Sequence, residues 1–338
     1  MRYVQIGNET WQFWDDLAKM GLSEEEATDW YLQCLETYVE AIRAVAPSVE
    51  TIADAHPLRL LPLYRERLGN RVQYVAHHLY LPWDWSRGVT RNGEPYPLAE
   101  MTAEEIWNAQ VGVPDIDGAG NSIDDSDVYE AARRAGYQVA ITEWNWNGYR
   151  GRGTAALDSS FARGIGAAGF LQAFMREGEA VGLGCQSMLV GTSWGITSIR
   201  VDAQRKQPAY FLPTGQVTMF YDHHHGPDLL EVQEANVPRY GQPFGMGDIR
   251  PKDGGVATVD TLATADQGKV YLHAINRSFT EDLKVTVALS GFAGVGEEAV
   301  QWRFEGRLED RPRGGRSPEV ARIEGTPVAI NPAGNPLI

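Results

Sequence analysis

The chain has 338 residues, of which 43% are hydrophobic and 22% charged, and this composition is typical of a globular protein of one or two domains. Its net charge of −15 argues against a nucleic-acid partner, because phosphate binding requires clustered lysine and arginine. No stretch reaches the roughly 18 apolar residues of a membrane span, and no leader peptide follows Met1, so we expect no membrane partner and favour a cytoplasmic location.

The first two thirds of the chain predicts alternating strands and helices. Ser23 and Glu26 have the spacing of a capping box ahead of a long helix that ends near Ala46. The predicted strands are residues 2–8, 49–55, 71–81, 137–147 and 182–191. The other predicted helices are residues 58–69, 103–109, 126–135, 159–180 and 209–226. Nearly continuous apolar strands that alternate with helices indicate βα units and a parallel sheet.

The pattern changes near Gly226. Beyond it, short alternating runs such as KVYLHAIN (269–276) and AVQWRFEG (299–306) are separated by turn residues. Such runs indicate an antiparallel β-sandwich. We therefore predict two domains, residues 1–226 and residues 227–338.

The first domain supplies five βα units. A TIM barrel of the (β/α)8 type needs eight, so we predict an α/β fold of this type that lacks the first three units and is followed by an all-β sandwich. An open sheet of this kind exposes unpaired edges, and this predicts association, for example as a homo-oligomer.

Two predicted strands end in a glutamate. One carries Asn8-Glu9 and the other carries Glu143-Trp144-Asn145. Residues at the carboxyl ends of barrel strands face the active site. Two carboxyl groups about 5–5.5 Å apart suit retaining glycoside hydrolysis, a reaction that requires no cofactor and no metal.

Several strand ends resemble those of glycoside hydrolase family 51, which consists mostly of α-L-arabinofuranosidases. The matching motifs are YVQIGNET (3–10), VAHHLYL (75–81), VAITEWNWN (139–147) and GCQSMLVG (184–191). The tail YLHAINRSFTEDLKVTVAL (271–289) is similar to the β-sandwich that follows the barrel in that family. The resemblance implies that residues 2–8 form the fourth barrel strand and that strands one to three lie outside this chain.

The resemblance also implies roles for particular residues. Glu9 would be the general acid and base, Glu143 the nucleophile, and Asn8 a donor to the 2-hydroxyl of the sugar. His78 and Tyr80 match a His-x-Tyr motif whose tyrosine contacts the nucleophile. The remaining substrate-binding residues would be Gln186, Trp144 and Asn145.

The implied activity is that of a retaining α-L-arabinofuranosidase acting on an arabinose-containing oligosaccharide or polysaccharide. Two alternatives stay open. One is a related retaining enzyme, such as an endoglucanase or a xylosidase. The other is a non-catalytic fragment or subunit of such an enzyme.

Other motifs favour structural interpretations. DHHHG (222–226) reads as a solvated helix end rather than a metal site. DIDGAGNSIDDSD (115–127) departs from the calcium-loop pattern and reads as a polar loop. Both cysteines, Cys34 and Cys185, are expected to be reduced and packed in the core. Two groups of aromatic residues could line a sugar site or pack in the core, and these are Trp11, Phe13 and Trp14 together with Trp83 and Trp85.

Overall fold

The protein is described by a computed structural model. The described residues are 1–82, 88–113, 128–148, 159–204, 206–247, 249–291, 298–312, 319–327, 329–330 and 336–337. The calcium-like loop at 115–127 and the tryptophans Trp83 and Trp85 lie outside them. Within the described ranges, none of the helices combines the length and the apolar character that crossing a membrane requires.

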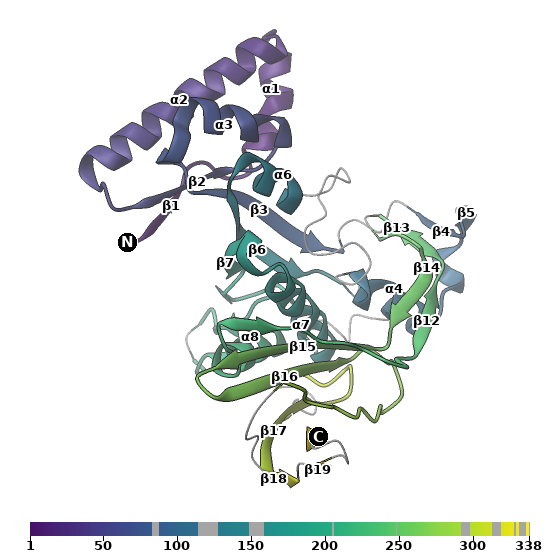
Figure 1. The fold of residues 1–338 in the computed structure, drawn as a ribbon. Coiled ribbons are helices and arrows are strands. Elements are labelled where there is room, and N and C mark those ends of the chain that lie inside the picture. The colour runs from purple at the N-terminus through teal and green to yellow at the C-terminus, as the bar shows by residue number, and fades with distance from the viewer. Residues whose placement is uncertain are drawn as a thin grey trace.

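A curled, five-stranded parallel sheet forms the first part of the molecule (Figure 1). Its strands, in spatial order, are β1 (Tyr3–Gln5), β2 (Glu50–Asp54), β3 (Tyr74–Leu81), β6 (Gln138–Trp146) and β7 (Val181–Gln186). All four neighbouring pairs are parallel. The predicted parallel sheet of five βα units is therefore confirmed, and its shape is that of a half-barrel.

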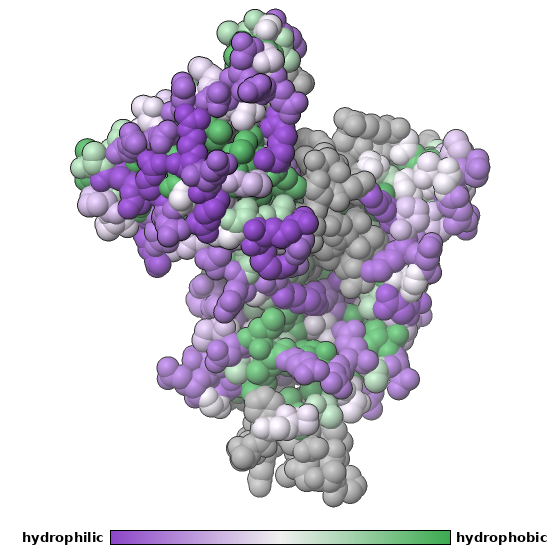
Figure 2. All heavy atoms as spheres, turned by 45° about the horizontal axis from the view of Figure 1, so that its top comes forward, coloured by the Kyte–Doolittle hydropathy of each residue, from purple (hydrophilic) through white to green (hydrophobic). Residues whose placement is uncertain are grey.

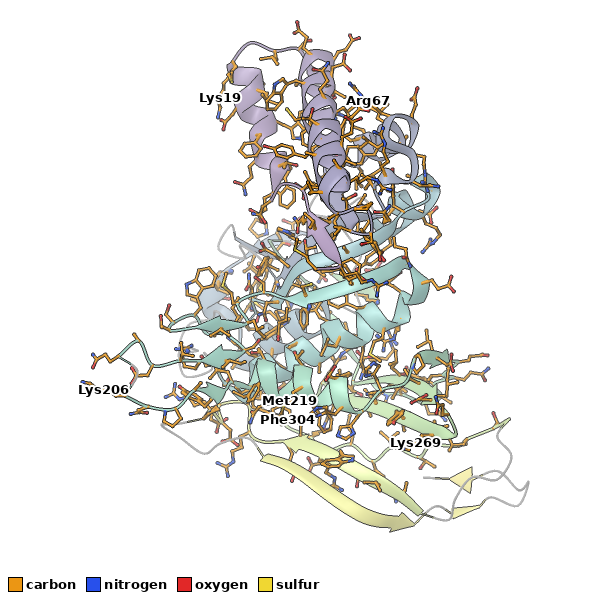
Figure 3. All side chains as sticks on the ribbon, turned by 90° about the vertical axis from the view of Figure 1, so that its left-hand side faces the viewer. Lys19, Arg67, Lys206, Met219, Lys269 and Phe304 are labelled. Carbon is orange, nitrogen blue, oxygen red and sulfur yellow. The ribbon has the colours of Figure 1, made fainter. Side chains whose placement is uncertain are left out.

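Helices pack against this sheet and against one another. They are α1 (Phe13–Lys19), α2 (Glu24–Val45), α3 (Leu61–Leu68), α4 (Ala103–Val111), α6 (Val128–Ala135), α7 (Phe161–Arg176) and α8 (Pro213–His223). Figure 3 shows α1 and α3 at one end, marked by Lys19 and Arg67, and the later strands at the other, marked by Lys269. The capping box of α2 is present, because Ser23 Oγ accepts from Glu26 N at 3.2 Å and Glu26 Oε2 accepts from Ser23 N at 2.8 Å.

Successive residues of each strand point to opposite faces, and the packing follows this period. On β3, Val75 and Leu79 belong to the main core beneath the helices. Tyr74 and Ala76 belong to a smaller cluster on the concave face, together with Ala140 of β6. The concave face is thus apolar at its base, and His78 and Tyr80 continue the same face toward the carboxyl end of β3.

Both cysteines are unpaired, but the prediction that both pack in the core is wrong for Cys185. Its side chain is exposed on β7, which has one neighbour, β6, among the described strands. Cys34 is half-buried on α2. The same helix exposes Trp30 and Tyr38, and Figure 2 shows a few hydrophobic residues within the otherwise hydrophilic surface over the N-terminal helices.

The strands after residue 226 pair antiparallel, as predicted. They are β11 (Asp228–Leu230), β12 (Arg239–Gln242), β13 (Phe244–Met246), β14 (Lys252–Ala257), β15 (Val259–Asp266), β16 (Lys269–Asn276), β17 (Glu298–Glu305), β18 (Glu319–Pro327), β19 (Ala329–Ile330) and β20 (Pro336–Leu337). Three short strands precede them, namely β8 (Val190–Gly191), β9 (Ile199–Arg200) and β10 (Tyr210–Phe211). The described strands form several small sheets, and their arrangement as a sandwich stays a prediction.

Contacts cross the predicted domain boundary at Gly226. β13 pairs with β4 (Val89–Arg91), which forms a hairpin with β5 (Glu94–Tyr96). Trp107 of α4 is fully buried, and its indole N–H donates to the carbonyl of Arg277 at 2.8 Å. A further contact joins β17 to α8, because Phe304 packs against a cluster that contains Val217 and Tyr221 of α8. The two predicted domains therefore share packed surface, and the boundary itself stays a prediction.

A buried histidine lies between the sheet and α8. The ring of His273 on β16 stacks on Tyr221, with centroids 5.0 Å apart and an interplanar angle of 15°. Burial, together with the nearby His225 and His224, lowers the pKa of His273 to about 4. Its imidazole therefore stays neutral in the folded protein at a pH where the unfolded chain binds a proton.

This difference predicts acid destabilisation. Because the unfolded state binds the extra proton between pH 6.5 and about 4, stability falls as the pH falls through that window. Relative to His273→Phe, which keeps an aromatic ring against Tyr221, the wild type should lose about 2 kcal/mol more unfolding free energy between pH 7 and pH 5. Urea unfolding at both pH values measures this, and equal losses in the two proteins would contradict it.

Candidate active site

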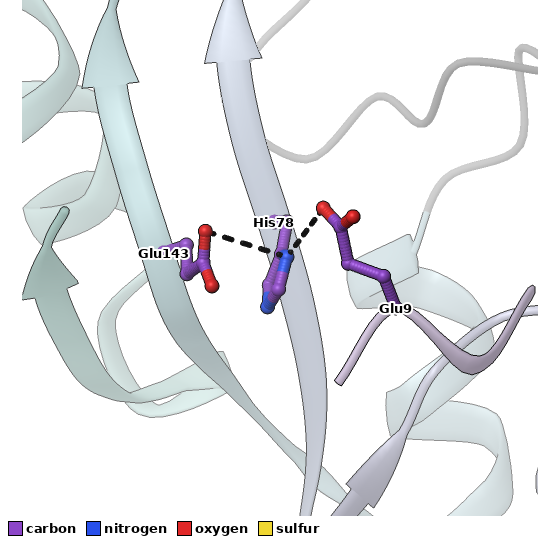
Figure 4. Close-up of side chains that lie close together, drawn as sticks. All are labelled: Glu9, His78 and Glu143. Carbon is purple, nitrogen blue, oxygen red and sulfur yellow. Dashed lines mark hydrogen bonds and ion pairs between the residues drawn. The ribbon is translucent and has the colours of Figure 1, made fainter. Parts of the chain in front are cut away.

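Three side chains from three strand ends meet on the concave side of the half-barrel (Figure 4). Glu9 follows β1, His78 lies on β3, and Glu143 lies on β6. His78 Nδ1 is 3.0 Å from Glu9 Oε1 and 3.8 Å from Glu143 Oε2. One carboxylate oxygen of Glu9 lies within 4.8 Å of one of Glu143. The structure thus brings together the two glutamates that the sequence analysis singled out.

The burial of the three groups differs. The side chain of His78 is 3% exposed, whereas those of Glu9 and Glu143 are 30% and 32% exposed. The imidazole is therefore fixed in the wall between the carboxylates, and both carboxylates are open to solvent or to a ligand. The indole ring of Trp11 packs edge-to-face against the imidazole of His78, with 5.4 Å between the ring centroids.

A β-bulge sets the direction of Glu143. The pairing of β3 with β6 is regular as far as His77 and Ile141, and it resumes at His78 and Glu143. Thr142 is the extra residue on β6. Bulges near active sites re-aim side chains, and this one places Glu143 directly opposite His78.

The turn that carries Glu9 is unusual. Glu9 has φ 51° and ψ 44°, in the left-handed region that residues with a Cβ rarely adopt. Gly7 precedes it with φ 87°, and a Cβ there would lie 2.6 Å from Thr10 Cγ2. The side chain of Gln12 donates to Glu9 Oε2. The turn is therefore closely packed and directs the Glu9 carboxylate toward His78.

Tyr80 supports the second carboxylate. Its hydroxyl donates to Glu143 Oε2 at 2.7 Å, and the Ser187 hydroxyl contacts the same phenol oxygen. Burial raises the pKa of the Tyr80 hydroxyl, and the neighbouring Glu143 carboxylate raises it further. Tyr80 therefore stays protonated and acts as a hydrogen-bond donor to Glu143.

Tyr80→Phe removes that donor and keeps the ring. Because hydrogen bonds to charged groups contribute about 1.5–3 kcal/mol, we expect kcat of a reaction that uses the Glu143 carboxylate to fall roughly 10-fold to 100-fold. Steady-state kinetics measures this, with Tyr38→Phe on the exposed face of α2 as the control. A Tyr80→Phe variant with unchanged kcat would exclude a role for this hydrogen bond.

The other predicted site residues lie around this group rather than in it. Asn8 is exposed beside Glu9. Trp144 is buried toward α7, where it packs on Phe170 and Phe174. Its neighbour Asn145 is fully buried, and its amide donates to the carbonyls of Ser187 and Ile196 at 3.0 Å each. Asn145 thus fixes the segment that carries the Ser187 hydroxyl.

Gln186 points toward α8. Its side-chain oxygen accepts from Ser198 Oγ at 2.6 Å and from Thr218 Oγ1 at 2.9 Å. These two bonds occupy the amide oxygen of Gln186, a residue that the resemblance assigns to substrate binding. Ser187, one residue later, is the β7-end side chain that joins the site through Tyr80. Ser187 lies within the strand-end motif GCQSMLVG, but the sequence analysis assigned a role in that motif to Gln186 alone.

The three aromatic residues near the N-terminus, Trp11, Phe13 and Trp14, lie in different surroundings. Trp11 contacts His78 and His56, whereas Trp14 packs against Tyr31 and Phe13 is exposed. At the other end of the half-barrel α8 ends at His223, so the DHHHG run lies at a helix end, as predicted.

Glu9, His78 and Glu143 also form the one group of potential metal ligands found in the described part of the chain. All three groups already have protein partners, because His78 Nδ1 pairs with Glu9 and Glu143 accepts from Tyr80. The arrangement suits proton transfer and nucleophilic attack by carboxylates.

Comparisons with known proteins agree on the fold. An α-L-arabinofuranosidase from Thermotoga maritima, solved with arabinose, has a TM-score of 0.63 at 17% identity, over 96% of this chain and 62% of that one. A GH51 arabinofuranosidase from Xanthomonas axonopodis pv. citri has a TM-score of 0.61 at 15% identity, and the match covers 100% of this chain and 64% of that one. CelM2, a bifunctional glucanase-xylanase from a metagenome library, has a TM-score of 0.54 at 14% identity, and the match covers 92% of this chain and 57% of that one.

Neither the family models nor the curated proteins compared with this sequence gave a match. The chain spans less than two thirds of the length of the solved structures cited above. Identities this low establish a common fold only. The fold is a mixed α/β arrangement, with a half-barrel parallel sheet and further β-sheets, that occurs in solved glycoside hydrolases.

Proposed function

We propose that this chain carries the catalytic residues of a retaining glycoside hydrolase, most closely an α-L-arabinofuranosidase that releases arabinofuranose from arabinose-containing oligosaccharides or polysaccharides. The observation that carries the proposal is the pair of carboxylates, with oxygens of Glu9 and Glu143 within 4.8 Å of each other. This spacing supports a retaining mechanism, because inverting enzymes separate their carboxyl groups by about 6.5–9.5 Å to admit a water molecule.

In the proposed reaction, Glu143 attacks the anomeric carbon while Glu9 protonates the departing glycosidic oxygen. The bond to the leaving group breaks and a covalent bond to Glu143 forms. Glu9, now a carboxylate, removes a proton from water, which attacks the same carbon and releases the sugar with its original configuration. Tyr80 holds the Glu143 carboxylate at 2.7 Å, and His78 holds Glu9 at 3.0 Å.

A second candidate is a glucanase or xylanase activity. It is favoured by the fold likeness to CelM2, which is a bifunctional glucanase-xylanase. The two candidates share the carboxylate pair and differ in the sugar that the site accepts.

The test is hydrolysis of 4-nitrophenyl glycosides of α-L-arabinofuranose, β-D-xylose and β-D-glucose by the purified chain. A Glu9→Ala, Glu143→Ala double variant serves as the blank. Turnover of the arabinofuranoside that vanishes in the double variant supports the first candidate, and selective turnover of another sugar supports the second. If every substrate stays intact, this chain is not a self-sufficient glycosidase, which favours the non-catalytic fragment or subunit.

Light scattering on the same sample measures oligomeric state. A monomer that turns over substrate excludes a homo-oligomer as the active form. Activity that rises with protein concentration, together with a dimeric mass, supports one.

A further inference from the structure

A third carboxylate lies behind the catalytic pair. Asp54 is the last residue of β2, and it is fully buried. Its Oδ2 accepts the backbone N–H of Thr10, the residue after Glu9, at 2.7 Å. Its other oxygen, Oδ1, is buried without a hydrogen-bond partner among the described residues. A buried carboxylate is costly unless it is hydrogen-bonded, and the hydrogen bond that Asp54 accepts comes from the Glu9 turn.

The turn requires such an anchor. Glu9 adopts a left-handed backbone that costs a residue with a Cβ about 1–3 kcal/mol, and such a residue persists only where the surroundings impose it. The Thr10 side chain is also buried, and its hydroxyl donates to the phenol oxygen of Tyr31 at 3.3 Å. The amide of Thr10 is thus the point at which the turn is tied to the sheet.

The Asp54 carboxylate also interacts electrostatically with Glu9 and His78. Burial raises the pKa of Asp54, the N–H and hydroxyl of Thr10 and the neighbouring His78 lower it, and the negative charge of Glu9 raises it again. The carboxylate is therefore close enough to Glu9 and His78 for both of them to affect its pKa. It lies beneath the turn, whereas Glu9 itself points to the opening.

We infer that Asp54 is a positioning residue for the general acid: its carboxylate fixes the Thr10 amide and so holds the Glu9 carboxyl where it reaches the leaving oxygen. The inference rests on the proposed function and extends it to a residue that makes no contact with substrate. Asp54 acts on the step that needs a proton and not on the attack by Glu143.

This distinction gives the test. Protonation matters for a poor leaving group such as phenol and hardly at all for a good one such as 2,4-dinitrophenol. Asp54→Ala should therefore lower kcat/KM for the phenyl glycoside roughly 100-fold and for the dinitrophenyl glycoside less than about 3-fold, because misplacing a catalytic group costs about that factor. Asp54→Asn keeps an oxygen that can accept from Thr10, and it should retain most of the activity on both substrates.

The control is Asp202→Ala. Asp202 also accepts backbone N–H groups, those of Gln204 and Lys206, and it lies between β9 and β10 rather than in the Glu9 turn. Its leaving-group dependence should match the wild type. Equal losses on both substrates in Asp54→Ala would overturn the inference, because a general loss of structure would affect every substrate alike.

A second measurement does not depend on turnover. In protein labelled with 15N-threonine, the Thr10 amide should exchange slowly with solvent in the wild type and in Asp54→Asn, and at least 10-fold faster in Asp54→Ala. An unchanged exchange rate in Asp54→Ala would overturn the inference even if that variant lost activity. A wild type that hydrolyses no glycoside removes the proposed function, and Thr10 exchange then decides whether Asp54 holds this turn.

Discussion

Replacing Glu143 by alanine is expected to lower kcat on 4-nitrophenyl α-L-arabinofuranoside roughly 10⁴-fold or more, because no other described side chain is placed to attack from this position. Tyr80 donates to Glu143 at 2.7 Å, but a phenol whose pKa is raised by burial remains protonated and cannot replace a carboxylate. Initial-rate measurements at saturating substrate check this. A Glu143→Ala variant with wild-type kcat would mean that Glu143 is not the nucleophile.

Glu9→Ala should behave differently, which separates the two roles. Loss of the acid slows the departure of poor leaving groups, while dinitrophenyl glycosides still form the covalent intermediate and release a burst of dinitrophenol. Added azide should then attack that intermediate and yield a glycosyl azide with the substrate's configuration. In Glu143→Ala, azide would displace the leaving group directly and give the opposite configuration. Glu130→Ala, on the exposed face of α6, should match the wild type in both assays.

Much of the first part of the fold follows from the sequence, because its signals are local. Ser23 and Glu26 predict the start of α2, and apolar runs bounded by turn residues predict all five strands of the parallel sheet. The sequence predicts less well which residues of the sheet are exposed to solvent. Period-2 alternation cannot say which strand lies at an edge, and Cys185 is exposed for that reason.

Within the site, the sequence indicates which side chains lie close together, because the carboxyl ends of parallel strands lie at one edge of the sheet. That rule brings together Glu9, His78, Tyr80 and Glu143. It cannot predict a bulge, which depends on pairing between strands distant in sequence. Nor can the rule predict that the Gln186 side chain points toward α8, since the Thr218 hydroxyl that donates to it lies 32 residues away in sequence.

The largest stability effect is expected away from the site, at Asp260. This carboxylate is buried on β15, accepts from Arg277 Nη2 at 2.5 Å, and is also paired with Arg176. The Arg277 side chain is 1% exposed. Asp260→Ala removes the carboxylate that neutralises a buried guanidinium, and breaking a buried pair from one side costs about 3–5 kcal/mol.

Asp260→Asn separates charge from shape. It keeps a hydrogen-bond acceptor for Arg277 but not the negative charge, so its loss of unfolding free energy should be smaller than that of Asp260→Ala. Asp16→Ala is the surface comparison, because Asp16 pairs with Lys19 in solvent, where such pairs contribute about 0–1 kcal/mol. Urea unfolding at pH 7 ranks the three variants. If Asp260→Ala lost no more stability than Asp16→Ala, Asp260 would contribute no more to folding than an exposed ion pair, and the contact between β15 and the end of α7 would depend on apolar packing alone.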